Sequence, residues 1–268
     1  NSSDYGATWI GRGYGSNTLV QVAISANGQY QACVATSLEI QISRNYGVTW
    51  TSAGSGGTSA AYTGIAMSSS GQYITATIQP TSQPRISSNY GLTFEVGDIS
   101  LSYISIAMSS TGQFQIAGTT TTSQVSTNYG VNWTGSNMPG TNHRFVAISS
   151  TGKYRSGVNT SASDTIKQSS NNDSGWSSVG PSTNYFAIAM SATGQYQTAV
   201  SQTSSGLIYI SSNFGETWSA AATDSRSLSV AYGKDASGVG MWIVTAGRRD
   251  RNIASTSANT MAYSYDGK

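Results

Sequence analysis

One eight-residue phrase recurs along the chain, and its regular spacing constrains the fold more than any other feature. It reads SSDYGATW, SRNYGVTW, SSNYGLTF, STNYGVNW and SSNFGETW, and we call it the turn phrase. A degenerate copy, SSNNDSGW, precedes the last of these. The aromatic residues that close the six copies are spaced 39 to 44 residues apart. A nearly constant period in this range indicates a chain built from repeated supersecondary units.

A second phrase recurs between the turn phrases and divides each repeat into strands. It reads VAISANGQY, IAMSSSGQY, IAMSSTGQF, VAISSTGKY and IAMSATGQY, and we call it the hairpin phrase. A sixth copy has diverged to VAYGKDASGVGMW. Each repeat thus predicts a strand, a glycine turn, a second strand, a polar loop, a third strand, the turn phrase and a fourth strand. Four strands in about 42 residues, without a capped helical pattern, predict one blade of a β-propeller.

The repeats predict an all-β fold: a six-bladed β-propeller of four-stranded antiparallel blades, formed by residues 1–268 as a single domain. The N-terminal segment supplies a lone fourth strand, and the C-terminal repeat supplies three strands. We therefore expect residues 6–11 to complete the blade that begins near residue 226, so that the ring closes without an exposed edge. The predicted blades are 17–55, 56–98, 99–138, 139–181, 182–225, and 226–268 together with 1–12.

The chemistry of the turn phrase is that of a tight turn. Its Asn or Asp accepts hydrogen bonds from nearby backbone N–H groups, and the glycine two residues later adopts positive φ at no steric cost. Accepting an N–H requires a carbonyl oxygen and not a charge, so a mixture of Asn and Asp fits a turn better than a metal site or a general acid. We therefore assign a structural turn role to Asp4, Asn45, Asn89, Asn128, Asn213 and Asp266.

Composition excludes several classes of function. The net charge is +2 and only 9% of the residues are charged, which is too little for a nucleic-acid binder that relies on a basic face. A single cysteine, Cys33, rules out an intramolecular disulfide and a cysteine zinc site, and a single histidine rules out a histidine-rich metal site. No apolar run is long enough to span a membrane, and no phosphate-binding glycine motif is present. We therefore expect no metal, no cofactor, no nucleic-acid partner and no membrane insertion.

The turn phrase resembles the Asp-box, or BNR repeat, of sialidases, sortilin-type receptors and photosystem assembly factors, and the resemblance recurs along the whole chain. It implies a propeller in which the phrase joins the third and fourth strands of each blade, away from the active site. Sialidase chemistry uses a tyrosine nucleophile assisted by glutamate, an acid/base aspartate and an arginine cluster. The chain has only three glutamates, lacks the Arg-Ile-Pro motif of sialidases, and places Arg44 and Arg85 near turn phrases. We therefore expect that the chain is not an enzyme, and keep two alternatives: a sialidase-like glycoside hydrolase, and an assembly-factor or scaffold propeller.

The candidate binding residues lie where the repeats diverge. The hairpin and turn phrases share one end of each blade, so the variable loops share the other end, as binding loops on a rigid scaffold do. Aromatic side chains with a basic rim suit a carbohydrate or an acidic partner. The candidate ligand-binding residues at that end are Tyr62, Tyr103, His143, Arg144, Tyr185, Arg248, Arg249 and Arg251.

These features favour a non-catalytic recognition module that binds a glycan or the surface of another protein. The low charge and the richness in Ser, Thr, Gly and Asn resemble those of propellers in secreted microbial proteins and in proteins of large viruses. We therefore expect an extracellular or virion-surface location, and a monomer for the isolated domain.

Overall fold

The chain folds into antiparallel β-sheets. The computed structural model describes residues 8, 10–11, 18–160, 163–201, 207–223, 227–234, 240–246 and 261–265. Within these ranges every regular element is a strand, and none of the residues lies in a helix. The search for a helix able to cross a membrane, made over the same residues, therefore finds none. The prediction of an all-β fold is confirmed.

The strands belong to two compact units, which we describe separately. The first unit comprises Asn1–His143 with Ser150–Gly152, and the second comprises Arg144–Ser149 with Lys153–Lys268. The strands of the first unit are β1 (Leu19–Ile24), β2 (Gln31–Leu38), β3 (Gln41–Ser43), β4 (Thr51–Ser52), β5 (Ala60–Met67), β6 (Ile74–Ile78), β7 (Arg85–Ser87), β8 (Glu95–Val96), β9 (Tyr103–Met108), β10 (Gln115–Thr119), β11 (Gln124–Ser126) and β12 (Thr134–Gly135).

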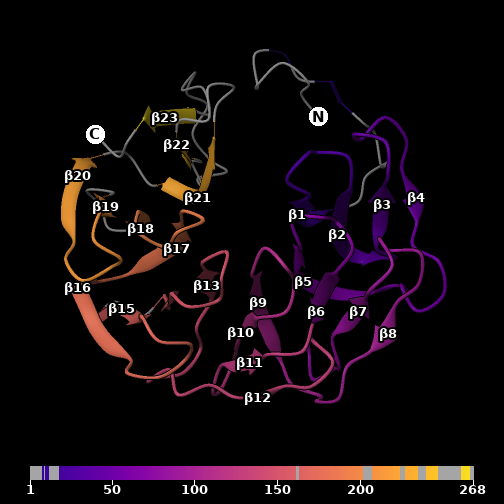
Figure 1. Cartoon of the computed structure of the whole chain (residues 1–268), viewed down its shortest axis with the longest axis horizontal. Coiled ribbons are helices and arrows are strands. Elements are labelled where there is room, and N and C mark those ends of the chain that lie inside the picture. Colours follow the sequence, from indigo (N-terminus) through magenta and orange to yellow (C-terminus); the bar gives the residue numbers. More distant parts are fainter. Residues whose placement is uncertain are drawn as a thin grey trace, which may run out of the picture. The chain divides into compact units, whose positions relative to one another are not determined.

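The first unit contains three repeats of one four-stranded pattern. Each repeat pairs its strands in chain order, from β1 to β4, from β5 to β8 and from β9 to β12 (Figure 1). The hairpin phrase joins the first and second strands, and the turn phrase joins the third and fourth. Strand β2 also pairs with β5, which links the first two sheets. The hairpin and turn phrases therefore lie at one end of each sheet, which we call the turn end, and the variable loops lie at the other, the loop end.

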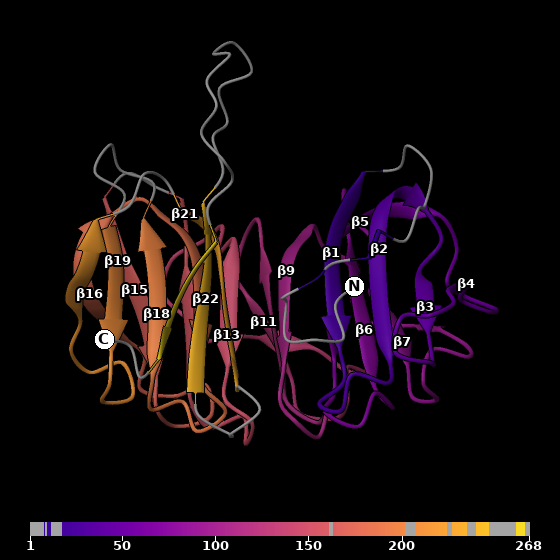
Figure 2. The same ribbon diagram turned by 90° about the horizontal axis from the view of Figure 1, so that it is seen from above.

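The second unit continues the pattern. Its two complete sheets pair β13 to β16 and β17 to β20 in chain order, and a third sheet contains β21, β22 and β23 (Figure 2). Of residues 6–11, expected to supply the missing strand, the structure describes 8, 10 and 11, and none of these lies in a strand. The strands are β13 (Phe145–Ile148), β14 (Arg155–Val158), β15 (Asp164–Ser169), β16 (Ser177–Thr183), β17 (Tyr185–Met190), β18 (Gln197–Ser201), β19 (Leu207–Ser211), β20 (Ser219–Thr223), β21 (Ser227–Lys234), β22 (Gly240–Ala246) and β23 (Met261–Tyr265).

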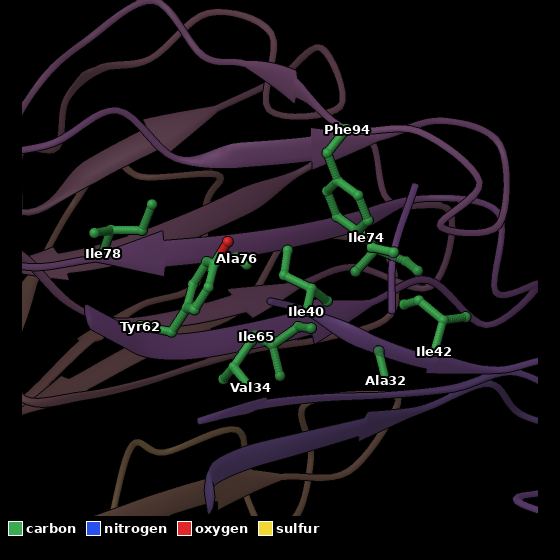
Figure 3. Packing of buried hydrophobic residues seen from close by; sticks show 11 residues of the cluster. Ala32, Val34, Ile40, Ile42, Tyr62, Ile65, Ile74, Ala76, Ile78 and Phe94 are labelled. Carbon is green, nitrogen blue, oxygen red and sulfur yellow. The ribbon is translucent and has the colours of Figure 1, made fainter. Parts of the chain in front are cut away.

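The core lies between successive sheets and is built mainly from their first three strands. Strands β6 (ITATI) and β10 (QIAGT) are buried along their whole length, including their threonines and the glutamine of β10. Figure 3 shows the cluster between the first two sheets, where Val34 and Ile40 of the first sheet meet Tyr62 and Ile74 of the second. The outermost strands β4, β8 and β12 have two exposed residues each. The sheets are therefore held together through their inner strands.

The hairpin and turn phrases also join neighbouring sheets at the turn end. The ring of Tyr30, from the first hairpin phrase, packs on the ring of Tyr90, from the turn phrase of the second sheet, with centroids 4.7 Å apart and an interplanar angle of 32°. The same ring covers Gly71, where an added Cβ would lie 2.6 Å from it, so only glycine fits there. Equivalent pairs stack at 4.3 Å for Tyr73 and Tyr129 and, in the second unit, at 4.7 Å for Tyr154 and Phe214. The aromatic residue of one hairpin phrase thus packs against both phrases of the following sheet.

Within the turn phrase, the Asn side chain closes the turn from both sides. The amide oxygen of Asn89 accepts hydrogen bonds from the Ser87 hydroxyl at 2.9 Å and the Thr93 N–H at 3.0 Å. Its amide nitrogen donates to the Thr93 hydroxyl at 2.8 Å. The other complete turn phrases in the described residues make the same bonds to oxygen, around Asn45, Asn128 and Asn213. Asp4 and Asp266, to which the same role was assigned, lie outside the described residues.

Candidate functional site

The three tyrosines expected to bind a ligand are core residues. Tyr62, Tyr103 and Tyr185 lie at or near the start of the first strands β5, β9 and β17. Each of these residues is at most 1% exposed. Each hydroxyl donates to the carbonyl oxygen four residues earlier, at 2.7, 3.1 and 2.6 Å respectively. Burial raises the pKa of Tyr62 to about 12 and also raises the pKa of the other two hydroxyls. The ligand-binding assignment of these tyrosines is therefore corrected: they anchor the loop that precedes each first strand.

His143 occupies the place of such a tyrosine in the fourth repeat. It precedes Val146 by three residues, as Tyr62 precedes Ile65, and it is fully buried. Its Nε2 donates to the carbonyl oxygen of Pro139, again four residues earlier, at 3.2 Å, while Nδ1 lies 2.9 Å from the Ser123 hydroxyl. The expected exposed ligand role of His143 is corrected in the same way.

Arg144 is the described candidate that remains at the surface. Its side chain is exposed. The described residues form two ion pairs, Arg155 with Asp173 and Lys167 with Asp164, and neither includes Arg144. By position in the repeat, Arg144 corresponds to Thr63, Ile104 and Phe186, the residues that follow the buried tyrosines. Arg248, Arg249 and Arg251, the other arginines of the predicted site, lie outside the described residues.

A β-bulge at this same position turns one residue out of the regular alternation in five of the six first strands. The register shifts there, so the bulged residue has no direct partner on the second strand. Bulges re-aim side chains, and proteins place them next to functional sites. Strand β13 begins one residue later, at Phe145, so Arg144 immediately precedes it. The bulged residues are Val20, Thr63, Ile104, Phe186 and Leu228.

In the second unit this position is held by Arg144 and Phe186, and Phe145 follows Arg144 in the chain. The first strands β13 and β17 lie side by side, and the rings of Phe145 and Phe186 have their centroids 5.7 Å apart with an interplanar angle of 41°. Both phenylalanines are half-buried. We call Arg144, Phe145 and Phe186 together the Arg144 surface. Neither phenylalanine was among the candidate residues predicted from the sequence. Phe186 directly follows Tyr185 in the chain, and Phe145 directly follows Arg144.

The charges around this surface are largely neutralised. Asp164, at the loop end of the same unit, accepts a hydrogen bond from Lys167 Nζ at 2.8 Å and another from the Thr165 N–H at 2.8 Å. Its charge is one of the weaker influences that raise the pKa of Tyr185, after burial and Tyr209. No group of three His, Cys, Asp or Glu residues able to hold a metal ion occurs among the described residues. The Arg144 surface therefore offers aromatic faces and one cation.

Arg85 in the first unit also requires a correction. It was placed near the turn phrases, but it begins β7 at the loop end. Its Nη1 donates to the carbonyl oxygen of Gln83 at 3.2 Å, and its charge acts on the hydroxyl of Tyr62, partly opposing the effect of burial on the pKa. The error arose because β7 has only three residues, so a residue close to the turn phrase in sequence still reaches the opposite end of the sheet.

Comparison with known proteins shows the fold. No protein-family model matches the chain, and no curated protein matches its sequence. An ancestral GH74 enzyme has a TM-score of 0.68 at 15% identity, over 93% of this chain and 38% of that one. The GH74 xyloglucanase from Xanthomonas campestris has a TM-score of 0.61 at 11% identity, over 91% and 46%. YCF48 bound to D1 peptide has a TM-score of 0.60 at 13% identity, over 87% and 76%.

These similar structures are β-propellers, so the chain has a β-propeller fold. It spans less than half the length of the two GH74 enzymes. The prediction that the chain is not an enzyme is overturned, because glycoside hydrolases are among the structures most similar to it. That prediction rested mainly on the residues of sialidases, whereas most glycosidases use a pair of Asp or Glu residues, and no facing pair could be assigned from the sequence.

Proposed function

We propose that this β-propeller binds a carbohydrate chain at the loop end of its sheets, with the Arg144 surface as part of the site. The observation that carries the proposal is the pair of half-buried rings, Phe145 and Phe186, next to the exposed Arg144. Aromatic rings offer an apolar face with a fixed geometry against which the C–H face of a sugar can pack. An arginine supplies several hydrogen-bond donors in a rigid plane. Few polar groups beside aromatic faces are typical of ligand sites.

The comparisons support this proposal through the shared fold. One similar structure is named a xyloglucanase, an enzyme that acts on a polysaccharide. Its identity to this chain is 11%, so the support concerns the scaffold and not the ligand. The residues of the Arg144 surface have to supply the recognition.

Binding to a panel of oligosaccharides, followed by calorimetry on those retained, tests the proposal. Replacing Phe186 by Ala is expected to weaken binding about tenfold or more, because stacking surface is lost. Lys153→Ala is the matched control, since Lys153 is exposed and lies over the Tyr154 ring at the turn end. Thermal unfolding of each variant separates lost binding from lost folding. Binding that is unchanged in a folded Phe186→Ala protein would remove this surface from the site.

A second candidate function is glycoside hydrolysis, which the structural similarity to GH74 enzymes favours. The loop end carries described carboxylates in both units, Glu39 between β2 and β3 and Asp164 at the start of β15. Incubating the protein with each retained oligosaccharide and measuring new reducing ends tests this candidate. Reducing ends that accumulate with enzyme concentration would establish hydrolysis, and their absence from every bound glycan would exclude it for those glycans.

We also propose that the six sheets are the blades of one ring, closed when residues 6–11 add a strand to the sheet of β21, β22 and β23. The exposure of β1 supports this. Its Val22 and Ile24 are 65% and 59% exposed, whereas Ile65 and Ile106, which correspond to Val22, are buried. An apolar strand face of this kind requires a cover. Deleting residues 1–12 should lower the midpoint of urea unfolding and increase binding of an apolar dye; a deletion without either effect would contradict the closure.

A further inference from the structure

We infer that the carbohydrate bound at the Arg144 surface is an anionic glycan, one that carries carboxylate or sulfate groups. This inference rests on the proposed function and names its ligand class. It comes from the charges that the described residues leave unpaired at the loop end of the second unit.

The charged side chains described in the second unit can be assigned one by one. Arg155 pairs with the buried Asp173, and Lys167 pairs with Asp164. Lys153 belongs to a hairpin phrase and Glu216 to a turn phrase, so both lie at the turn end. Arg144 is the remaining one of these charged residues. It lies at the loop end, and neither ion pair of the described residues includes it. Among the described residues of this end, a ligand therefore meets the Arg144 cation without a carboxylate paired to it.

The backbone beside Arg144 is held in place before any ligand arrives. The preceding residue, His143, has both ring nitrogens in contact with hydrogen-bonding groups, and its carbonyl oxygen accepts from the Ser105 hydroxyl at 3.3 Å. Anchoring the neighbouring residue reduces the conformational freedom that Arg144 loses on binding. A guanidinium presented in this way can make two parallel hydrogen bonds to a carboxylate or sulfate group.

The aromatic pair next to Arg144 specifies that the anion is attached to a larger, partly apolar ligand. Phe186 is the bulged residue of β17, and its ring contacts Phe145 of β13. A free inorganic anion would use Arg144 alone and gain nothing from these rings. A sugar ring that carries a charged group can use both, with its C–H face on a phenylalanine and its anionic substituent on the guanidinium.

Calorimetry with matched glycans tests the inference. The ligands are an oligogalacturonate, the same oligosaccharide with its carboxylates reduced to alcohols, and a sulfated oligosaccharide. We expect the intact protein to bind an acidic form about tenfold or more tightly than the reduced form, and to lose that preference in 0.5 M salt. Arg144→Ala should weaken acidic binding about tenfold and weaken binding of the reduced form less, because the reduced form loses hydrogen-bond donors but no charge attraction. Arg144→Lys should recover only part of the loss, because lysine retains the charge without the planar donor pair. Lys153→Ala is the charge-matched control.

The outcomes separate the two levels of the proposal. Equal affinity for the acidic and reduced forms, with Arg144→Ala without effect, would overturn the anionic class while leaving glycan binding in place. Binding of none of the glycans in the wider panel would overturn the proposed function itself. Preference for the uronate over the sulfated oligosaccharide, or the reverse, identifies which anionic group the site accepts. Binding of free sulfate or acetate as tightly as the oligosaccharides would also contradict the inference, because the aromatic pair would then contribute nothing.

Discussion

Two glycines of the hairpin phrase can separate the cost of backbone conformation from the cost of packing between sheets. Gly28 and Gly71 occupy the same place in successive repeats and have φ values of 78° and 82°. An added Cβ at Gly28 would have its nearest neighbours at 3.9 Å, whereas at Gly71 it would lie 2.6 Å from the ring of Tyr30. Both substitutions to Ala therefore introduce the same backbone strain, and only the second forces a ring to move.

The expected magnitudes follow from these two terms. Holding an alanine in the left-handed conformation costs about 1–2 kcal/mol, so Gly28→Ala should reduce the free energy of unfolding by that amount. Gly71→Ala should add the cost of overpacking, about 1–3 kcal/mol. Urea unfolding followed by tryptophan fluorescence measures both, provided that the dependence on urea concentration is unchanged. Gly135→Ala, with no atom within 4 Å of its added Cβ, is the control.

Equal destabilisation by Gly28→Ala and Gly71→Ala would refute the role of the phrases as a joint between sheets. A double substitution sharpens the test. Tyr30→Ala removes two of the three side-chain atoms that lie 2.6 Å from the new methyl group, so Gly71→Ala should cost less in that background than in the intact protein. A cost that is independent of Tyr30 would show that the glycine serves the turn alone.

Three further predictions follow from the turns and the buried groups. Asn89→Asp should change stability by less than about 0.5 kcal/mol, because the acceptor oxygen is retained, whereas Asn89→Ala should lose about 1–2 kcal/mol with its hydrogen bonds; urea unfolding distinguishes them, and equal losses would contradict the acceptor role. Asp173→Gly should destabilise the protein by about 3–5 kcal/mol because Arg155, 1% exposed, loses its partner; adding Arg155→Gln should recover most of that loss, and purely additive effects would disprove the coupling. Burial raises the pKa of the Cys33 thiol to about 11, so the folded protein should resist a thiol-specific reagent at pH 8 and react once unfolded in urea. Because that pKa exceeds its unfolded value, the contribution of Cys33 to stability is complete below about pH 9 and declines as the pH rises toward 11; rapid labelling of the native protein at pH 8 would contradict the burial.

The fold was predictable because the same pattern of strands and turns recurs along the chain. One hairpin phrase is a weak signal, but copies at a constant period assign the same four strands to each repeat. The register confirms antiparallel pairing in chain order in each complete sheet. The bulge is different, because it depends on how the backbone bends at the start of a first strand. The repeats therefore placed the tyrosines among the candidate ligand-binding residues, whereas the structure buries them.

The position of His143 could have exposed that error from the sequence. The residue three places before the Val or Ile of each hairpin phrase is Tyr62, Tyr103, His143 and Tyr185 in four successive repeats. His143 and Arg144 were both taken as candidate ligand-binding residues, and the histidine was not assigned to the position of the tyrosines. In the correct alignment a histidine replaces a tyrosine with the same hydrogen bond to the carbonyl four residues earlier. The arginine then falls at the position that is bulged in the other five first strands, which is where the proposed site lies.

The degenerate turn phrase, SSNNDSGW, keeps the turn between its two strands although much of its sequence has changed. Asp173 stands where Gly130 stands in the preceding repeat, with a φ of 78° against 83°, so a non-glycine residue holds the left-handed conformation. At Gly130 an added Cβ would lie 3.1 Å from the side chain of Gln115, and in the degenerate repeat the residue at the place of that glutamine is Arg155. The Arg155 guanidinium lies 3.7 Å from the Asp173 carboxylate. The Asp173 side chain thus occupies the place that has no side chain at Gly130. The Trp176 indole still donates to the Asp173 carbonyl oxygen, as the Trp133 indole does to that of Gly130. Two unfavourable changes, a strained aspartate and a buried arginine, thus compensate each other, and the repeat keeps its backbone while its sequence departs from the phrase.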